Sequence, residues 1–196
     1  MAYLARQKAV AQKHAPETLQ QEVALPAGIT LEVTKNLVTV RKGEKTISKK
    51  FIFGDLKLVV QEKSAQITAL RKTRAAVRLA KTLEAHLLNL CHGVQEGFTY
   101  TLKICAGHFP MNVSVAGQDF IIKNFLGESV PRKIKLPQGV SVKVAGDQVT
   151  VHADSKELAG QAAASIEKLT VVKGRDLRVF QDGIYIIKKG TKSMLE

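Results

Sequence analysis

The side chains with the clearest chemical potential in this sequence are those of lysine and arginine. The chain holds 30 of them against 17 Asp and Glu, a formal net charge of +13 over 196 residues. Such a surplus concentrates phosphate-rich polymers and anionic surfaces around a protein. It therefore predicts phosphate binding, with nucleic acid as the first partner to consider. The candidate RNA-binding cations form three groups: Lys42, Lys45, Lys49 and Lys50; Arg71 and Arg74; and Lys173, Arg175, Arg178, Lys188, Lys189 and Lys192.

Two of these groups have a second interpretation. Residues 41–50 hold five cations and one Glu, a composition that is typical of a solvated loop as well as of RNA contact. Four cations between Arg71 and Lys81 step by three and four residues, so they gather on one side of a helix. That side would lie in water, either with or without a phosphate against it.

Two cysteines and two histidines offer a possible zinc site, at Cys91, His92, Cys105 and His108. Structural zinc sites usually use closely spaced ligand pairs such as CxxC. Cys91 and His92 are adjacent, and on a helix they would project about 100° apart. The pattern favours core and loop positions over a metal site, and stoichiometric zinc in the purified protein would contradict this.

The sequence carries no recognisable catalytic motif. No strand-like segment is followed by GxxxxGKS/T or GxGxxG, and no GxSxG motif occurs. The acidic residues are dispersed or lie next to Lys and Arg, so paired-carboxylate catalysis has no anchor. We therefore expect no catalytic residue, no cofactor and no small-molecule substrate.

Membrane and secretory classes are also not expected. No apolar run approaches the roughly 18–20 residues that span a bilayer. Two cysteines without a paired framework suit a reducing compartment. The first fourteen residues contain no acid, which favours a solvated basic extension over a transit peptide.

An internal repeat indicates the architecture. The stretch PAGITLEVTKNLVTV at 26–40 aligns without gaps with PQGVSVKVAGDQVTV at 137–151. The two share the Pro, the first Gly and four later positions, and fixed-offset self-similarity of this kind indicates duplication. We therefore expect one small domain that is present twice.

Hydrophobic periodicity and the repeat predict an α+β fold with two tandem similar domains, each with several strands and one main helix. Helical spacing runs from Lys72 to His92, and Gly93 is expected to end that helix. A second helix follows Asp154, whose side chain could accept from the free amides of the first turn. The expected divisions are an N-terminal extension at 1–24, formed by a tail or frayed helix, a first domain at 25–106, a second domain at 107–190 and a C-terminal tail at 191–196. Period-two alternation places strands at 29–34, 37–40, 51–60, 98–105, 113–115, 120–125, 132–136, 140–144, 149–151 and 184–187.

Three segments carry a resemblance to a known family: HFPMNV at 108–113, NFLGE at 124–128 and RVFQDGIY at 178–185. They resemble the signature segments of the universal large-subunit ribosomal protein family numbered six in the bacterial series and nine in the eukaryotic one. The similarity is to the archaeal and eukaryotic branch, and it covers 26–43 and 71 to about 190 in order. The chain departs from the family where Lys42-Gly43 continues as Glu44-Lys45, because members usually have a second glycine soon after this point.

The resemblance implies two similar α+β domains, each an antiparallel or mixed β-sheet packed against one main helix, which agrees with the repeat. Family members bind large-subunit ribosomal RNA, mainly through the second domain, beside the sarcin-ricin loop and the landing site of translational GTPase factors. By position, the RNA-facing segment would be 172–178, which includes Gly174, together with Asp182, Gly183 and 188–190. Glycines there would let the backbone approach phosphate closely.

We therefore expect a structural, non-enzymatic constituent of the large ribosomal subunit, active in cytoplasmic translation. Its implied partners are large-subunit ribosomal RNA and neighbouring ribosomal proteins, with translational GTPase factors nearby and no membrane. The expected location is the cytoplasmic ribosome, after assembly in the nucleus or nucleolus if the source is eukaryotic. Two alternatives remain: an extraribosomal RNA-binding or ribosome-assembly module on the same duplicated fold, and a nucleic-acid-modifying enzyme, which would need a polar catalytic cluster.

Overall fold

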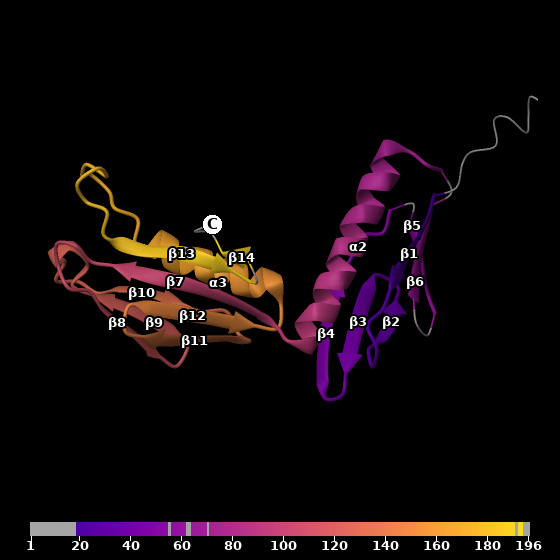
Figure 1. The fold of residues 1–196 in the computed structure, drawn as a ribbon, viewed down its shortest axis with the longest axis horizontal. Coiled ribbons are helices and arrows are strands. Elements are labelled where there is room, and N and C mark those ends of the chain that lie inside the picture. The colour runs from indigo at the N-terminus through magenta and orange to yellow at the C-terminus, as the bar shows by residue number, and fades with distance from the viewer. Residues whose placement is uncertain (1–18, 55, 62–63, 70, 191, 194–196) are drawn as a thin grey trace, which may run out of the picture. The chain divides into compact units, whose positions relative to one another are not determined.

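The computed structural model describes residues 19–54, 56–61, 64–69, 71–190 and 192–193. These residues form an α+β protein with two compact units, which divide between Val94 and Gln95. Each unit combines antiparallel sheets with one long helix (Figure 1). The α+β fold with repeated sheet-helix units, predicted from periodicity and the internal repeat, is therefore confirmed.

The first unit contains two three-stranded antiparallel sheets and helix α2. The strand orders are β1-β6-β5 and β2-β3-β4. The apolar faces of both sheets share one core with α2, centred on fully buried side chains such as Val38, Ile67 and Leu87. The elements are β1 (Leu19–Ala24), β2 (Thr30–Thr34), β3 (Leu37–Lys42), β4 (Lys45–Lys50), β5 (Leu56–Val60), β6 (Ser64–Ala69) and α2 (Arg74–Gln95).

Helix α2 confirms the predicted amphipathic pattern but ends later than predicted. Its buried side chains include Ala76, Ala80 and Leu83, which step by four and three. Gly93 does not end the helix; it is buried within it, and α2 continues to Gln95. The left-handed residue beyond the last turn is Gly97, with φ 77°, so a glycine does follow the helix.

The second unit contains a five-stranded sheet, a three-stranded sheet and helix α3. The strand orders are β11-β12-β7-β13-β14 and β10-β9-β8. One apolar core joins both sheets to α3, with Phe120, Leu102 and Ile166 fully buried in it. The elements are β7 (Phe98–Cys105), β8 (Asn112–Ala116), β9 (Asp119–Lys123), the 3-10 turn η1 (Phe125–Gly127), β10 (Arg132–Lys135), β11 (Val140–Ala145), β12 (Gln148–Ala153), α3 (Lys156–Leu169), β13 (Gly183–Lys189) and β14 (Lys192–Ser193).

Strand β7 lies in a different unit from the one that the sequence assigns to it. The alternation at 98–105 predicts this strand correctly, but the sequence counts it with the first domain at 25–106. In the structure β7 pairs with β12 on one side and β13 on the other, and Tyr100 and Leu102 belong to the second core. Its backbone ladder therefore makes it a central strand of the second unit.

Three strands in the first unit were not predicted. Residues 19–24, expected in a tail or frayed helix, form β1 and pair with β6, itself unpredicted. Residues 45–50 form β4 against β3, so most of the segment 41–50 is strand and not a solvated loop. Residues 51–54 precede β5, which begins only at Leu56. Residues 1–18 of the expected extension lie outside the described residues.

The beginning of α3 also differs from the expectation. The helix starts at Lys156, and the capping position belongs to Ser155, which makes no side-chain cap hydrogen bond. Asp154 lies one residue before this position, and acceptance of first-turn amides by its side chain stays a prediction. Glu157 in the first turn still interacts favourably with the positive end of the helix dipole.

The duplicated stretches fold into matching hairpins. Strands β2 and β3 pair with Val33 opposite Val38, and β11 and β12 pair with Val144 opposite Val149. Their backbones also match, because Gly28 and Gly139 have φ 79° and 81°. At the turn, however, Gly146 with φ 60° corresponds to a lysine, Lys35, with φ 55°.

Lys35 therefore occupies a left-handed conformation that glycine adopts without steric cost. Lys35→Gly is expected to raise the free energy of unfolding of the first unit by about 0.5 kcal/mol, because a left-handed L-residue costs about 1–2 kcal/mol and the glycine's extra chain entropy offsets part of this. Gly146→Ala, at the equivalent position, should lower the stability of the second unit by about 1 kcal/mol. Urea unfolding followed by circular dichroism tests both, and two changes of the same sign would contradict the equivalence.

Candidate nucleic-acid interface

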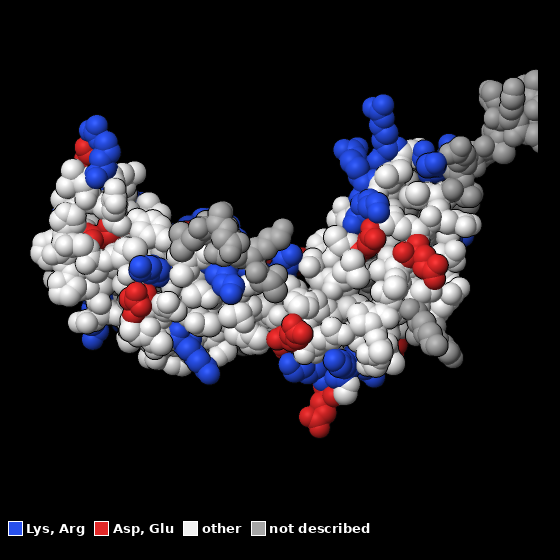
Figure 2. Space-filling view, viewed as in Figure 1, with Lys and Arg blue, Asp and Glu red and all other residues white. Residues whose placement is uncertain are grey.

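The loop between α3 and β13, residues 170–182, carries the densest exposed charge of the predicted RNA-facing segment, and we call it the cationic loop. Lys173, Arg175 and Arg178 are all exposed in it, beside one exposed acid, Asp176, whereas the second acid, Asp182, is buried. In Figure 1 this loop projects beyond the start of β13, and Figure 2 shows blue cationic side chains at the same place. Asp182, from the segment RVFQDGIY, fixes one end of the loop, and Arg132, which pairs with Glu128 of the segment NFLGE, fixes the other.

Asp182 fixes the C-terminal end of the cationic loop. Its carboxylate, only 3% exposed, accepts hydrogen bonds from the backbone N–H groups of Gly107 and His108, the latter at 3.2 Å. Its second oxygen accepts from Nδ1 of the His108 ring at 2.7 Å. The segment that begins HFPMNV is thereby tied to the segment RVFQDGIY.

These hydrogen bonds also determine the charge state of Asp182. Burial alone would raise the pKa of this carboxyl, since water no longer solvates its charge. The donors on Gly107 and His108 outweigh burial and hold the pKa below its ordinary value. Asp182 is therefore an ionised, internally satisfied carboxylate at neutral pH.

Arg132 fixes the N-terminal end of the loop. Its guanidinium forms a two-pronged ion pair with Glu128, at 2.8 and 2.6 Å, and lies over the Phe125 ring at 4.2 Å. The same group donates to the carbonyl oxygens of Leu169, at 2.7 Å, and Val171, at 3.3 Å. The hydrogen bonds from Arg132 lower the pKa of Glu128, which keeps the pair ionised.

The segment NFLGE makes this arrangement possible by turning sharply. Asn124 and Leu126 are left-handed, with φ 61° and 51°, and Gly127 follows with φ 79°. Residues other than glycine rarely adopt this backbone conformation, so surrounding contacts must stabilise it. The Asn124 amide donates to the carbonyl of Pro110 at 3.0 Å, and Leu126 is buried. NFLGE therefore connects to HFPMNV and presents Glu128 to Arg132.

Helix α3 and strand β13 are joined directly beneath the loop. The hydroxyl of buried Thr170 donates to the Glu167 carbonyl at 3.0 Å and accepts from the Ile184 N–H at 3.0 Å. The Glu167 carboxylate accepts from the Ile186 N–H at 3.1 Å. The loop therefore starts and ends on elements that are bonded to each other.

Within the loop, two cations are held by neighbours. The Arg175 guanidinium lies 4.9 Å from the Phe180 ring, which stacks on His108 with ring centroids 4.7 Å apart. Arg178 pairs with Asp176 at 2.9 Å, and this pairing lowers the pKa of Asp176. Both guanidinium groups stay exposed, so they remain accessible to an anion.

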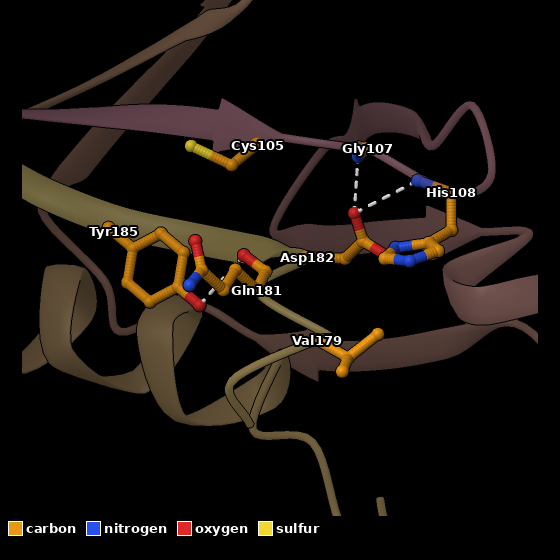
Figure 3. Close-up of a pocket in the computed structure, with 7 residues that line it drawn as sticks. All are labelled: Cys105, Gly107, His108, Val179, Gln181, Asp182 and Tyr185. Atoms are coloured by element: carbon orange, nitrogen blue, oxygen red, sulfur yellow. Dashed lines mark hydrogen bonds and ion pairs between the residues drawn. The ribbon is translucent and has the colours of Figure 1, made fainter. Parts of the chain in front are cut away.

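A surface hollow lies beside the loop, where Cys105, His108, Asp182 and Tyr185 meet (Figure 3). A Cys-His-Asp set invites comparison with a hydrolase, in which the nucleophile must reach its base. Figure 3 shows the Cys105 sulfur directed toward the Tyr185 side of the hollow, with the His108 ring on the far side. The His108 ring instead bonds to Asp182 and stacks on Phe180, which is a structural arrangement.

The structure sorts the predicted residues of the second unit into two kinds. Lys173, Gly174, Arg175 and Arg178 lie exposed in the loop, and Lys188 and Lys189 lie exposed on β13. Asp182 and Gly183 are buried, and a Cβ on Gly183 would come within 3.0 Å of the Tyr185 ring. Both residues therefore lie beneath the loop's exposed surface, where Asp182 helps to position the loop. Lys192 belongs to β14, and its side chain lies outside the described part of the chain.

In the first unit, the predicted cations lie on the β3–β4 hairpin and at the start of α2. Lys42 and Lys45 are exposed beside the turn at Gly43, which takes φ 59° and closes the hairpin without a second glycine. Lys50 is also exposed. Lys49 is half-buried, with its ammonium 3.2 Å from His86 Nδ1 and 5.4 Å from the Phe51 ring, so its charge already has partners.

The start of α2 is unusually cationic. Thr73 caps it by accepting from the Ala76 N–H at 3.1 Å. Arg71, Lys72 and Arg74 are exposed there, and the first turn contains no acid. Cations at a helix N-terminus oppose the helix dipole at a cost of about 0.3–1 kcal/mol each. Because these cations destabilise the N-terminus of α2, their presence there indicates a functional reason.

Sequence reasoning missed Arg132 and Tyr185. The signal for Arg132 was the opposite charge four residues earlier, Glu128. The signal for Tyr185 was its place between Ile184 and Ile186, where strand alternation turns it away from the core. The signal for Arg132 could not show its bonds to the carbonyls of Leu169 and Val171, which lie 37 and 39 residues away.

Metal ligation and membrane insertion find no support in the described residues. No group of three or more His, Cys, Asp or Glu side chains lies close enough to hold a metal among them. Within the described helices, none is both long and apolar enough to cross a bilayer.

Comparisons with known proteins match the region of the chain that holds the three resemblance segments. Residues 109–183 match the family described as ribosomal protein L6. The chain is 39% identical over 174 residues to the large ribosomal subunit protein uL6 of Methanococcus vannielii, covering 89% of this chain and 96% of the relative. It is 39% identical to the protein of the same name from Thermoplasma acidophilum over 87% of this chain and 96% of the relative. The corresponding protein of Methanospirillum hungatei is 33% identical, over 88% and 98%. The chain therefore belongs to the ribosomal protein L6 family.

Proposed function

We propose that this protein is a structural, non-enzymatic constituent of the large ribosomal subunit that binds ribosomal RNA chiefly through the cationic loop. The observation that carries the proposal is the double attachment of this loop, by Arg132 at one end and Asp182 at the other. Attachment lowers the entropy lost when exposed cations bind phosphate. The shared name of the relatives, large ribosomal subunit protein uL6, supports the same role.

The loop is suited to binding by charge and shape. Its exposed cations can neutralise phosphates, and Gly174, with φ 71° and no neighbour near its Cβ position, leaves room for a backbone to approach. Exposed Leu177 and Val179 flank Arg178 in sequence. Such a surface fits the backbone and minor groove of folded RNA better than it reads base sequence.

The finer placement within the ribosome follows from the family resemblance. We place the loop beside the sarcin-ricin loop of the RNA and near the landing site of translational GTPase factors. Neighbouring ribosomal proteins would cover further parts of the surface. The relatives named above come from archaea, so we place the protein on cytoplasmic ribosomes, and nuclear assembly would apply only if the source is eukaryotic.

The first unit would supply a second, weaker RNA contact through Arg71 and Arg74. Both are exposed at the start of α2, where their charge opposes folding. Lys42, Lys45 and Lys50 on the β3–β4 hairpin are further candidates, because they are exposed. Lys49 is a poorer candidate, since His86 and Phe51 already surround its ammonium.

Arg74→Glu should therefore change stability and binding in opposite directions. The acid would favour the helix dipole and raise the free energy of unfolding by about 0.5–1 kcal/mol. The same change should weaken RNA binding several-fold, because a phosphate contact becomes a repulsion. Urea unfolding and filter binding measure the two effects. Lys57→Glu on β5 is the matched charge reversal away from any helix end, and a similar gain in stability there would contradict the explanation.

Sedimentation of cell extracts tests the proposed function itself. The protein should travel with large subunits on a sucrose gradient and leave them only at high salt. A wholly free pool in growing cells would contradict the proposal. The rival function, an assembly module on the same fold, would be favoured if the protein joined precursor particles but was absent from translating ribosomes.

A further inference from the structure

Among the described residues of the second unit, no element packs on one face of the five-stranded sheet. Leu102, Val149 and Ile184 point into the core, where α3 and the three-stranded sheet lie. The alternate residues point the other way, because successive side chains of a strand alternate between faces. Thr99 and His152, which pair across β7 and β12, bond on this outer face through Oγ1 and Nδ1 at 3.1 Å.

The strand register places the outer side chains in two rows. Directly paired residues project to the same face, with Cβ atoms about 5 Å apart. Exposed cations stand in both rows, and none of the described outward residues of these four strands is an Asp or Glu. The rows run Lys143–Thr150–Thr101–Lys188 and Ala145–Gln148–Lys103–Tyr185.

Tyr185 ends one row as a rigid aromatic surface. One side of its ring covers the backbone of Gly183, since a Cβ there would lie 3.0 Å from ring carbon Cζ. Its hydroxyl donates to the Gln181 carbonyl at 3.0 Å, and burial, the main cause, raises the pKa of that hydroxyl. The side chain nevertheless remains 44% exposed and forms a wall of the hollow in Figure 3.

We propose that Tyr185 is a stacking platform for one unpaired RNA base, with Lys103 and Lys188 contacting the adjoining phosphates. This inference rests on the proposed function and adds a second, chemically distinct contact to it. Lys103 stands directly opposite Tyr185 across the ladder, and Lys188 lies just beyond the irregularity in β13.

Charge and chemistry together favour RNA as the occupant of this face. Cations, hydroxyls and amides dominate the two rows, whereas a protein segment would require apolar area or acids to pair with. Bases inside a duplex are covered by their neighbours, so only an unpaired base can offer its face to an aromatic ring. The Tyr185 ring is already held by its hydrogen bond to Gln181 and its contact with Gly183, so it loses little entropy when a base stacks on it.

The test uses the full chain and large-subunit ribosomal RNA transcribed from its source, with filter binding between 0.1 and 0.5 M salt. Base stacking contributes about 1–3 kcal/mol, so Tyr185→Leu should weaken binding roughly 5- to 150-fold with the salt slope unchanged. Tyr185→Phe, which keeps the ring, should bind much more tightly than Tyr185→Leu. Lys103→Ala should lower the slope by about 0.7. Val59→Ser, at an exposed strand position of the first unit, is the control for losing an exposed apolar side chain.

Three outcomes would overturn the stacking proposal. Binding by Tyr185→Leu equal to that of the unchanged protein would do so, as would equal losses for Leu and Phe. Ultraviolet crosslinking of the unaltered protein, which does not depend on any variant folding, should join Tyr185 to a nucleotide. A crosslink in intact subunits from the hollow to a neighbouring protein would assign the site to protein instead. If the unaltered protein shows no salt-dependent binding, the proposed function fails and not only this inference.

Discussion

Replacing Lys173, Arg175 and Arg178 together with Ala is expected to weaken ribosomal RNA binding about 100-fold or more at 0.1 M salt. Each phosphate contact releases counterions, so the slope of log affinity against log salt should fall by about 2–3. All three side chains are exposed on the cationic loop, and Arg132 and Asp182 hold the loop's ends without them. The free energy of unfolding should therefore change little.

A matched variant separates specific contact from loss of net charge. Lys123, Lys133 and Lys135 are equally exposed cations of the same unit, on β9 and β10. Their triple replacement with Ala removes the same three charges away from the loop. It should weaken binding only a few-fold, through the general field of the protein. Equal losses in the two triple variants would show that the loop has no special role.

Asp182→Ala is expected to lower the free energy of unfolding of the second unit by about 3 kcal/mol, because a buried, charge-assisted hydrogen-bond network loses its shared acceptor. Gly107 and His108 would lose the partner of their backbone N–H groups. RNA affinity should fall too, although Asp182 is buried, since the end of the cationic loop would be released. Urea unfolding and filter binding measure the two effects.

The effect of Asp182 should also depend on pH. Its pKa is depressed in the folded protein, so its contribution is present above the unfolded value of about 3.9. That contribution disappears as the pH falls through the folded pKa. The stability difference between the unchanged protein and Asp182→Ala should therefore shrink below about pH 4. Asp119→Ala, at an exposed carboxylate on β9, is the control, and an equal loss of stability there would contradict the account.

Periodicity and the internal repeat were sufficient to predict the sheet-helix class, α2 and most strands of the second unit. They failed where tertiary pairing decides the outcome. Strand β1 was predicted as part of a tail because three consecutive polar residues interrupt its sequence, LQQEVA, yet it pairs with β6. Strand β7 follows the first helix in sequence but finds its partners in the second unit. Local pattern carries no information about such distant partners.

The candidate site shows the same division. The cations of the loop could be read from composition, because exposed charge is a local property. The attachments at the ends of the loop could not be predicted from the sequence. Arg132 bonds to Leu169, and Asp182 to His108, across long stretches of chain. The family segments supply Asp182, its partner His108 and Glu128, the ion-pair partner of Arg132, so they act mainly in holding the loop. Asp182, predicted to face RNA, is one of these residues, and its burial explains why an acid lies beside so many cations.

The most direct test of the account is a density map of the large ribosomal subunit from the source of this protein. We predict that residues 172–178 lie against RNA, with the guanidinium of Arg175 and the ammonium of Lys173 at phosphates. The attachments at Arg132 and Asp182 should be unchanged from those described here. A map in which the cationic loop projects into solvent, with the RNA contacting other surfaces of the second unit, would contradict the central claim.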